Sequence, residues 1–397
     1  MSYVKNTKNH IIFDIVVVGA GPAGIAFACG FAGSSIKIAV VDKLPRKIIA
    51  NPKIDGREIA LTHHSVKILK QLNVWRYISI KSISVIKEAR VLDGDSTYYL
   101  NFDHQEIEKE CLGYLIPNYI IRKNLYKRSR NLSNITLINK AEFLSVNMGK
   151  QHASILLSNG KKIKTSLVVA ADGRFSKMRS KMGISAFTRD FNKNMIVCRM
   201  KHEKPHQNIA YEFFRYDQTQ ASLPYIKNLS GIITTATKDF TSTLMKMDKK
   251  KFNKEMESSF NNYFGKMKLL GKRYSYPMVT TYAKKFVSHR FAVIGDAAVG
   301  MHPVTAHGFN LGLKGLEILI NEIKTAIKNN TDIGLTAVLK NYQSKLHRVA
   351  APVYLATNGI INLYTSTILP SKLTRQFILR FVNTVKPVKQ TFLNILK

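Results

Sequence analysis

Cysteine is scarce in the sequence. Its three copies in 397 residues, Cys29, Cys111 and Cys198, are odd in number, widely spaced and never arranged as a C-x-x-C pair. This distribution argues against both a disulfide framework and a zinc site, and it fits a reducing cytosol. A G-x-S-x-G nucleophile turn is absent as well. We therefore expect neither a metal centre nor a serine nucleophile.

Acidic residues are also few. The sequence has 25 Asp and Glu against 61 Lys and Arg, which gives a formal net charge of +36. Such a charge attracts polyanions, and the candidate partners are nucleic acid, an anionic membrane surface or an acidic protein. The alternative is a solvated surface without a partner, typical of a Lys- and Asn-rich proteome. No helix-turn-helix, zinc-finger or RRM pattern occurs, so we do not expect nucleic acid to be a partner.

Long hydrophobic runs are interrupted by glycine. Residues 15–36 carry no charge and would be long enough to span a bilayer, but Gly19, Gly21 and Gly24 divide them. A β-branched run, Ile15 to Val18, precedes these glycines and an Ala-rich stretch follows, which predicts a buried parallel strand and a helix. The polar residues 1–10 do not resemble a signal peptide, so we expect a cytoplasmic protein.

The length and composition indicate a globular protein of two lobes. Single cores stop growing near roughly 250–300 residues, and this chain is longer. Its 45% hydrophobic and 22% charged residues are close to the averages of soluble proteins. Strand–helix patterns come first and return after residue 290, whereas aromatic-rich, alternating segments fill residues 187–277. We expect an α/β fold in which a mainly antiparallel lobe is inserted.

Individual elements follow from the same patterns. Strands are expected at 15–18, 36–41, 166–171 and 291–294, and helices at 64–72 and 308–328. Residues 113–132 predict a strand, a turn and a helix. Residues 336–397 are basic and helical in pattern, with Phe377, Ile378, Phe381 and Val382 at helical spacing.

The first strand–turn–helix unit carries a nucleotide-binding motif. Gly19-Ala20-Gly21-Pro22-Ala23-Gly24 is a G-x-G-x-x-G turn, in which glycines permit a tight turn and the close approach of a pyrophosphate. The helix N-terminus would then donate N–H groups to the phosphates. Asp42 ends the second strand, where a carboxylate accepts from ribose hydroxyls. This combination predicts a bound dinucleotide, either NAD or FAD.

Two later segments distinguish FAD from NAD as the bound dinucleotide. Val169 to Arg179, which contains Asp172-Gly173, resembles the "DG" motif of class A flavoprotein monooxygenases. Ile294 to Ala298, which contains Gly295-Asp296, resembles their "GD" motif, and Met301-His302-Pro303 and Gly308 to Gly312 follow it as in that family. The resemblance implies FAD as the cofactor and NAD(P)H and O₂ as cosubstrates.

Further segments resemble the flavin hydroxylases of ubiquinone biosynthesis. They are Asp55 to Thr62 with Asn73-Val74-Trp75, Gly113 to Asn118 with Arg122, and Tyr211 to Phe214 followed by Ala221 to Pro224. Asp55 to Thr62 and Val299 to Gly308 are closest to the subgroup that hydroxylates C5 of a demethoxyubiquinol-type intermediate. The implied fold is that of para-hydroxybenzoate hydroxylase, with a Rossmann-type FAD-binding domain, an inserted antiparallel-sheet substrate domain and C-terminal helices.

The resemblance divides the chain into three parts. Residues 1–75, 105–185 and 276–335 would form the FAD-binding domain, 76–104 and 186–275 the substrate domain, and 336–397 a basic helical region. The substrate would be a polyprenyl phenol or quinone, oxidised through a C4a-hydroperoxyflavin. Because its tail lies in the bilayer, the positive charge would dock the enzyme peripherally on the cytoplasmic membrane face. Other ubiquinone-biosynthesis proteins are further candidate partners.

The resemblance also assigns site residues. Asp296, at the end of a buried strand, would bond the ribityl or ribose hydroxyls, and the helix from Gly308 would direct its positive end at the flavin pyrimidine ring. Tyr211, Phe213, Pro224 and His302 would contact the substrate. The residues expected to contact FAD are Gly19, Gly21, Ala23, Gly24, Asp42, Arg57, Arg122, Asp172, Gly173, Gly295, Asp296, Pro303, Gly308 and Asn310.

The sequence departs from the common family pattern at four positions. The family has His at the position of Val299, Gly-Gln at Ala306-His307, and Asp at Gly315, so we expect a different pocket beside the flavin. His307 is the candidate catalytic residue, because it could donate to the hydroperoxide or to the phenol; the alternative is a packed helix-start residue. Two other functions stay open: a flavin enzyme acting on a soluble phenol or reducing a polyprenyl chain, and a basic binding or assembly protein whose flavin site has decayed.

Overall fold

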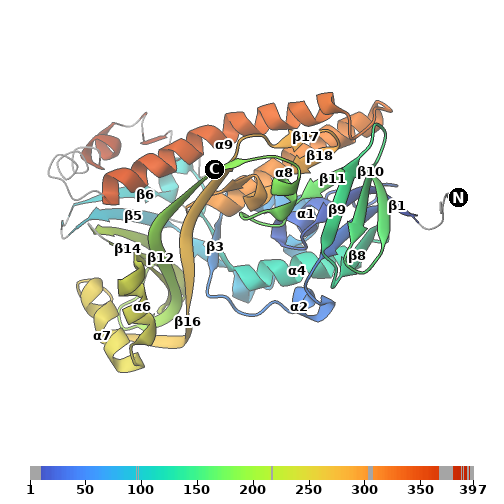
Figure 1. The fold of residues 1–397 in the computed structure, drawn as a ribbon. Helices are drawn as coiled ribbons and strands as arrows, with labels where there is room; N and C mark the ends of the chain where they lie inside the picture. Colours follow the sequence, from blue (N-terminus) through green and yellow to red (C-terminus); the bar gives the residue numbers. More distant parts are fainter. Residues whose placement is uncertain are drawn as a thin grey trace, which may run out of the picture.

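Two large sheets and one small sheet organise the fold in the computed structural model (Figure 1). The structure describes residues 10–94, 96, 98–215, 218–302, 307–365, 379–385, 387, 389, 390 and 393. No helix in these ranges is long and apolar enough to cross a membrane.

The first sheet is built on buried parallel strands in the order β18-β11-β1-β2-β8. Ile15 to Val18 of β1 are at most 7% exposed, because a run of β-branched residues can fill both faces of a covered sheet. The antiparallel strands β17, β9 and β10 extend the sheet. The bounds are β1 His10–Val18, β2 Ile38–Asp42, β8 Ile135–Asn139, β9 Phe143–Met148, β10 Ala153–Leu157, β11 Lys162–Ala170, β17 Val287–Ser288 and β18 Phe291–Val293.

Helix α1 packs against β1 and β2 of this sheet, and α4 and α8 pack against α1, on the side that faces the second sheet (Figure 1). Proline occupies the first turn of α1, where its missing N–H costs nothing. The helices predicted at 64–72 and 308–328 are present with shifts of one residue. The bounds are α1 Pro22–Cys29, α2 Arg46–Ala50, α3 His63–Gln71, α4 Asn118–Arg130, α5 Lys177–Lys181 and α8 His307–Lys328.

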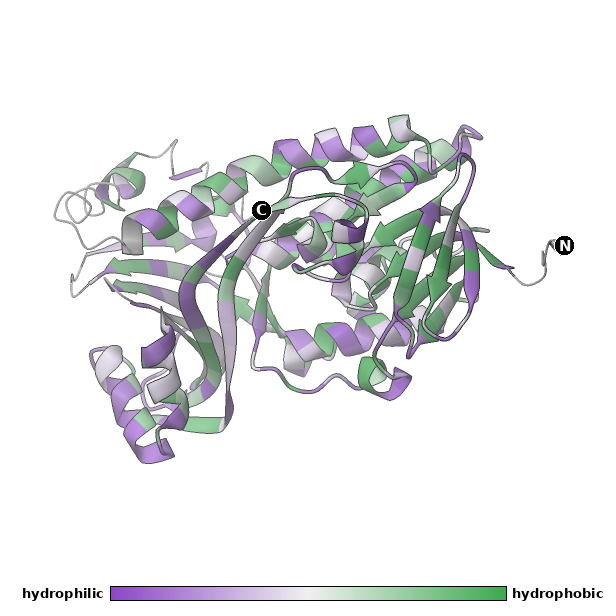
Figure 2. Ribbon diagram, in the orientation of Figure 1, coloured by the Kyte–Doolittle hydropathy of each residue, from purple (hydrophilic) through white to green (hydrophobic). Residues whose placement is uncertain are grey.

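The second sheet has the order β19-β16-β12-β15-β14-β13-β5-β6 and is antiparallel except for the pair β13–β5. Residues 187–277 therefore form strands as expected, but they also contain two helices, α6 and α7, which the alternating pattern did not predict. Hydrophilic residues cover the outer surface of these helices (Figure 2). The bounds are β5 Glu88–Asp93, β6 Tyr99–Asp103, β12 Ala186–His202, β13 Ile209–Arg215, β14 Gln218–Ile226, β15 Leu229–Thr237, α6 Lys238–Lys246, α7 Lys249–Ser259, β16 Met267–Ala283 and β19 Val299–Gly300.

A three-stranded sheet of β3 (Glu58–Leu61), β7 (Gly113–Pro117) and β4 (Ser84–Ile86) contacts β14 of the second sheet and also the helices α3, α4 and α8. Arg199 of β12 bonds Glu58 of β3 across this junction, with Nε 2.7 Å from Oε1. The division into FAD-binding, substrate and C-terminal regions stays a prediction. Strands β5 and β6 do join the strands of 186–275 in one sheet, whereas β4 joins the small sheet.

Helix α9 (Thr336–Thr365) runs along both large sheets (Figure 1). The buried Tyr342 hydroxyl donates to the Val293 carbonyl at 2.7 Å and fixes α9 to the end of β18. A short helical segment at 379–384 follows, in which Val382 is buried and Phe381 is 43% exposed. Phe377 and Ile378 lie outside the described residues.

Candidate functional site

The glycine turn between β1 and α1 is tightly packed on one side and open on the other. A Cβ on Gly24 would lie 2.0 Å from the Gly19 carbonyl oxygen, and one on Gly19 would lie 2.4 Å from that of Ala171. A Cβ on Gly21, by contrast, would have no heavy atom within 4 Å. Gly21 is the N-cap residue of α1, and because it has no side chain it cannot cap the first N–H groups of the helix. The first N–H groups of α1 therefore border open space, which fits a pyrophosphate.

Asp42 lies beside this turn at the end of β2. Its Oδ2 accepts from the Ala20 N–H at 2.7 Å and its Oδ1 from the Leu44 N–H at 2.8 Å. These bonds hold the carboxylate in place, and each oxygen keeps a second lone pair for a ribose hydroxyl.

Arg122, on α4, supplies a positive charge near the same turn. Burial lowers its pKa, and the carboxylates of Asp55 and Asp42 oppose that lowering. Arg57 is held differently, because its Nη2 lies 2.7 Å from Asp55 Oδ2 and its guanidinium covers the Tyr276 ring at 5.2 Å. Of the two, Arg122 is the one without an ion pair among the residues described.

Asp172 and Asn310 are used inside the protein. Asp172 accepts from the Ser176 hydroxyl at 2.5 Å and from the Met178 N–H at 3.1 Å, so it anchors the start of α5. The Asn310 amide donates to the Ala60 carbonyl at 2.8 Å and accepts from the Thr62 N–H at 3.1 Å. Their expected contacts with FAD thus stay predictions, and the hydrogen bonds seen here tie α5 and α8 to neighbouring elements.

Asp296 is more open, with a side chain 43% exposed and Arg174 Nη2 3.2 Å from Oδ2. Arg174 also donates to the Val279 carbonyl at 2.6 Å, and sequence reasoning did not single it out although it follows Gly173 directly. Gly295, with φ +57°, approaches Ala23 so closely that a Cβ would lie 2.7 Å from the Ala23 Cβ. A Cβ on Gly173, whose φ is +89°, would have no heavy atom within 4 Å.

Helix α8 begins beside this segment. His307 is its first residue, and Gly308 lies in its first turn. Gly312, one turn further on, would place a Cβ 3.7 Å from the Gly295 Cα. Pro303 and Ala306 lie outside the described residues. Two of the family departures are buried: Val299 on β19, and Gly315 on α8, where a Cβ would lie 3.3 Å from Leu346 of α9.

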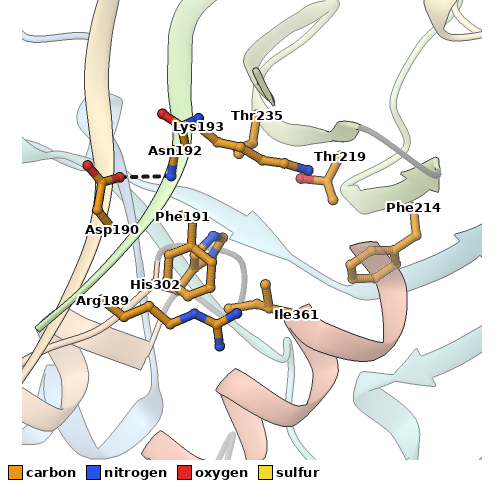
Figure 3. Close-up of a pocket in the computed structure, with 10 residues that line it drawn as sticks. All are labelled: Arg189, Asp190, Phe191, Asn192, Lys193, Phe214, Thr219, Thr235, His302 and Ile361. Atoms are coloured by element: carbon orange, nitrogen blue, oxygen red, sulfur yellow. Dashed lines mark hydrogen bonds between the residues drawn. The ribbon is translucent and has the colours of Figure 1, made fainter. Parts of the chain in front are cut away.

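A cavity of about 220 Å³ lies between the second sheet, α9 and the segment after Asp296 (Figure 3). Its back wall includes His302, which is 5% exposed and meets the Phe191 ring edge-on at 5.2 Å. Phe191 is covered in turn by Arg189 at 4.4 Å. The lining residues are Arg189, Asp190, Phe191, Asn192, Lys193, Phe214, Thr219, Thr235, His302 and Ile361.

The structure places three of the four expected substrate residues elsewhere. Tyr211 and Phe213 pack beneath α7, where the Tyr211 and Tyr263 hydroxyls are 2.7 Å apart and Phe213 meets Phe260. Pro224 has the same strand parity as Ser222, which pairs with Tyr211, and so lies on that face too. Their strand neighbours Phe214 and Thr219 line the cavity instead. Of that set, His302 alone lines the cavity, and its contact with a substrate stays a prediction.

One segment carries the letters of a zinc motif. His202 to His206 reads H-E-x-x-H, but it leaves a β-strand rather than forming a helix. The His202 ring nitrogens are 2.6 Å from the Lys204 carbonyl oxygen and 2.9 Å from the Ser230 hydroxyl, so the ring is fully bonded. Across the described part of the chain, no group of three His, Cys, Asp or Glu side chains could hold a metal.

His302 predicts a pH dependence of stability. Burial, followed by the charges of Lys193, Arg174 and Arg189, lowers its pKa to about 3. Because the folded state disfavours protonation, stability falls as the pH drops below the unfolded value of about 6.5, by about 2 kcal/mol at pH 5. Chemical denaturation from pH 7 to 5 should therefore show a shallower loss in His302→Gln. An identical slope in both proteins would contradict this account.

Together, these features define the class of protein. An open glycine turn after a parallel strand, a half-exposed aspartate after another strand and a nearby cavity lined in part by aromatic rings are typical of an FAD-dependent monooxygenase. Residues 13–356 match the family model described as FAD binding domain, and the chain belongs to that family.

Named relatives of the chain include hydroxylases. The chain is 39% identical to "Ubiquinone hydroxylase UbiM" of Neisseria meningitidis, covering 95% of this chain and 83% of the relative. It is 30% identical to "Ubiquinone hydroxylase UbiL" of Rhodospirillum rubrum, covering 96% and 89%. The p-nitrophenol 4-monooxygenase PnpA of Pseudomonas putida has the same fold, with a TM-score of 0.78 at 14% identity over 98% of both chains. The predictions of the fold class, of FAD as the cofactor and of a flavin monooxygenase are confirmed.

Proposed function

We propose that this enzyme hydroxylates the aromatic ring of a polyprenylated ubiquinone precursor, with C5 of a demethoxyubiquinol-type intermediate as the first position to test. The observation that carries the proposal is the position of the cavity. Arg174 lies 3.2 Å from Asp296, and its charge also lowers the pKa of His302 in the cavity lining. A ring in this cavity would thus lie near the residues that would bind the flavin. The names of the two relatives support the substrate class.

FAD, when bound, uses electrons from NAD(P)H to activate O₂ for transfer of one oxygen atom. The protein's own residues would bind and orient the cofactor. The start of α1 at Gly21 would receive the pyrophosphate, Asp42 a ribose, and Asp296 a ribityl or ribose hydroxyl. Arg122 would neutralise phosphate charge.

The cavity would hold the ring and exclude water. His302, Phe191 and Ile361 enclose it from three elements, and His302 is neutral at physiological pH because its pKa is lowered to about 3. His307 does not belong to the described lining. Its candidate role as a donor to the activated oxygen or to the phenol stays a proposal, for which the test is a comparison of His307→Gln with His302→Gln in coupling of NAD(P)H oxidation to product.

The experiment that tests the function uses lipid extracts from cells that lack individual ubiquinone hydroxylases. The enzyme, FAD and NAD(P)H should convert one accumulated prenylated intermediate to a product one oxygen heavier, and fragmentation identifies the ring carbon. Conversion of a soluble hydroxybenzoate alone would favour the soluble-phenol alternative, and a gain of hydrogen in the tail would favour a reductase. A protein that cannot be reconstituted with FAD would support the assembly-protein alternative.

The proposed membrane dock is electrostatic. The net charge of +36 includes the lysine-rich start of α7, Lys249 to Lys251, beside Lys254. Attraction to an anionic surface contributes about 1 kcal/mol per basic residue near it and is screened by salt. Sedimentation should therefore show binding to anionic vesicles that is released by added salt. Equal binding to neutral and anionic vesicles would remove the electrostatic part of the proposal. Binding to other ubiquinone-biosynthesis proteins stays a separate proposal.

A further inference from the structure

Arg174 links the segment around Asp296 to the second sheet. Its Nη2 lies 3.2 Å from Asp296 Oδ2, and its Nη1 donates to the Val279 carbonyl of β16 at 2.6 Å. Val279 pairs with Asp190 at the last position before the pairing of β12 with β16 is interrupted. Because two nitrogens of one planar guanidinium are bonded to two different elements, the orientation of the group is fixed.

Other contacts hold the rest of Arg174 in place. A Cβ on Gly300 of β19 would lie 3.1 Å from the Arg174 Cβ and 3.7 Å from its Nε, so the side chain packs along this strand. The Arg174 carbonyl accepts from Arg179 Nη1 at 3.3 Å, and the same nitrogen donates to the Ala297 carbonyl at 2.7 Å. The position of Arg174 relative to Asp296 is therefore set by several contacts rather than by one exposed ion pair.

The Asp296 carboxylate is only partly occupied by Arg174. Its side chain is 43% exposed, and the bond to Arg174 uses Oδ2. Among the residues that the structure describes, no donor bonds its Oδ1. An ionised carboxylate has about four acceptor positions, so Asp296 can accept a ligand hydroxyl while it stays bonded to Arg174.

Fixing this carboxylate favours ligand binding. An exposed side chain that a ligand immobilises loses rotamer freedom, and this loss weakens binding. Because the bond to Arg174 already restricts Asp296, a hydroxyl that binds there causes a smaller loss.

We propose that Arg174 is a positioning residue for FAD, which acts by holding the Asp296 carboxylate in the orientation that accepts a hydroxyl of the cofactor. Arg174 itself need not touch FAD. The inference rests on FAD as the cofactor and on the predicted contact of Asp296 with a ribityl or ribose hydroxyl. It does not rest on which aromatic ring the enzyme hydroxylates. The segment that carries Asp172-Gly173 would thus act on FAD through the segment that carries Gly295-Asp296.

The test is a double-mutant cycle on the Kd for FAD. FAD-free wild type, Arg174→Met, Asp296→Ala and the double variant are titrated with FAD, and the flavin fluorescence is recorded. Since a hydrogen bond to a charged group is lost in each case, each single substitution should raise the Kd by about tenfold or more. If Arg174 acts through Asp296, the double variant should match Asp296→Ala within about twofold.

Lys177→Met is the matched control. Lys177 lies three residues beyond Arg174 on α5, is exposed and carries the same charge. Within the described ranges it forms no ion pair with Asp296. Its Kd for FAD should stay within about twofold of the wild type. Thermal unfolding of each FAD-free protein shows whether the variants fold, and Arg174→Met should unfold within about 4 °C of the wild type because exposed ion pairs contribute little to stability.

Several results would overturn the proposal. A wild-type Kd in Arg174→Met or in Asp296→Ala would remove one of its two members. If Arg174→Met raises the Kd by the same factor with and without Asp296, Arg174 acts on FAD independently of this carboxylate. An equal effect of Lys177→Met would make it one of net charge, and an unfolded Arg174→Met would make the role of Arg174 structural.

The outcome is separate from that of the proposed function. The titration contains neither NAD(P)H nor a prenylated precursor. A failure to hydroxylate the precursor would therefore leave the result of the cycle unchanged, and a failure of the cycle would leave the proposed substrate unchanged.

Discussion

Gly21→Ala should fold normally and bind FAD poorly. A Cβ at this position meets no protein atom within 4 Å, so the free energy of unfolding should change by less than about 1 kcal/mol, the usual range for Gly against Ala at a helix start. The same Cβ would occupy the space in which the pyrophosphate approaches the N–H groups of α1. An extra methyl group in a tight contact costs about 1–3 kcal/mol, which corresponds to roughly a 5- to 150-fold higher Kd for FAD.

Two other glycines provide the comparison. Gly24→Ala should lose stability instead, because its Cβ would lie 2.0 Å from the Gly19 carbonyl oxygen. Gly359→Ala lies inside α9 with open space for the Cβ, so it should leave the Kd for FAD unchanged and raise the free energy of unfolding by up to about 1 kcal/mol. Flavin fluorescence titration measures the Kd for FAD, and denaturant unfolding measures the free energy of unfolding. Wild-type FAD affinity in Gly21→Ala would show that the pyrophosphate does not lie at this turn.

Arg199→Met should be among the most destabilising single substitutions. The Glu58 side chain is 2% exposed, and both Nε and Nη2 of Arg199 lie 2.7 Å from its Oε1. Burial raises the pKa of Glu58, and Arg199 opposes that shift. Removing one partner of a buried ion pair leaves a charge uncompensated and costs about 3–5 kcal/mol.

The pH dependence of stability and a double variant show whether the lost ion pair causes the instability of Arg199→Met. A carboxyl whose folded pKa is raised destabilises the fold once the pH exceeds its unfolded pKa of about 4.3, so the deficit of Arg199→Met should shrink as the pH falls from 7 to 5. Adding Glu58→Gln should restore part of the stability at pH 7. Lys251→Met, which breaks an exposed pair at 4.0 Å, should change stability by less than about 0.5 kcal/mol. A deficit independent of both pH and Glu58 would indicate lost packing rather than a lost ion pair.

Local patterns predict the flavin-binding half of the molecule well. The run Ile15 to Val18, the glycine turn and Asp42 lie within one βαβ unit, in which sequence neighbours are also structural neighbours. The same holds for α4 after β7 and for α8 after the segment around Asp296. Helices α6 and α7 were missed because their short amphipathic stretches lie among strongly alternating strands.

The cavity was harder to predict because it depends on strand parity. Tyr211 and Phe213 are the most conspicuous aromatics of β13, but the register of β13 with β14 turns them toward α7 and leaves Phe214 for the cavity. Which face of a strand meets the ligand is decided by partners far away in the sequence. The interruption in β12 that brings Lys193 into the lining has no sequence signal that we recognise.

The contacts of Arg174, Arg199 and Asn310 join residues more than 100 positions apart, so no local pattern reveals them. The motif residues Asp172 and Asn310 illustrate the converse. Their positions were predicted from family patterns, while the structure gives their side chains partners within the protein.

The origin of the oxygen in the product shows whether this enzyme transfers oxygen from O₂ to a prenylated ring. The reconstituted enzyme, NAD(P)H and a prenylated precursor are incubated under ¹⁸O₂, and the lipid extract is analysed by mass spectrometry. We expect each molecule of product to carry one ¹⁸O atom as a new hydroxyl on the aromatic ring. Oxidation of NAD(P)H with no ¹⁸O on the ring of any prenylated lipid would contradict the proposed hydroxylation.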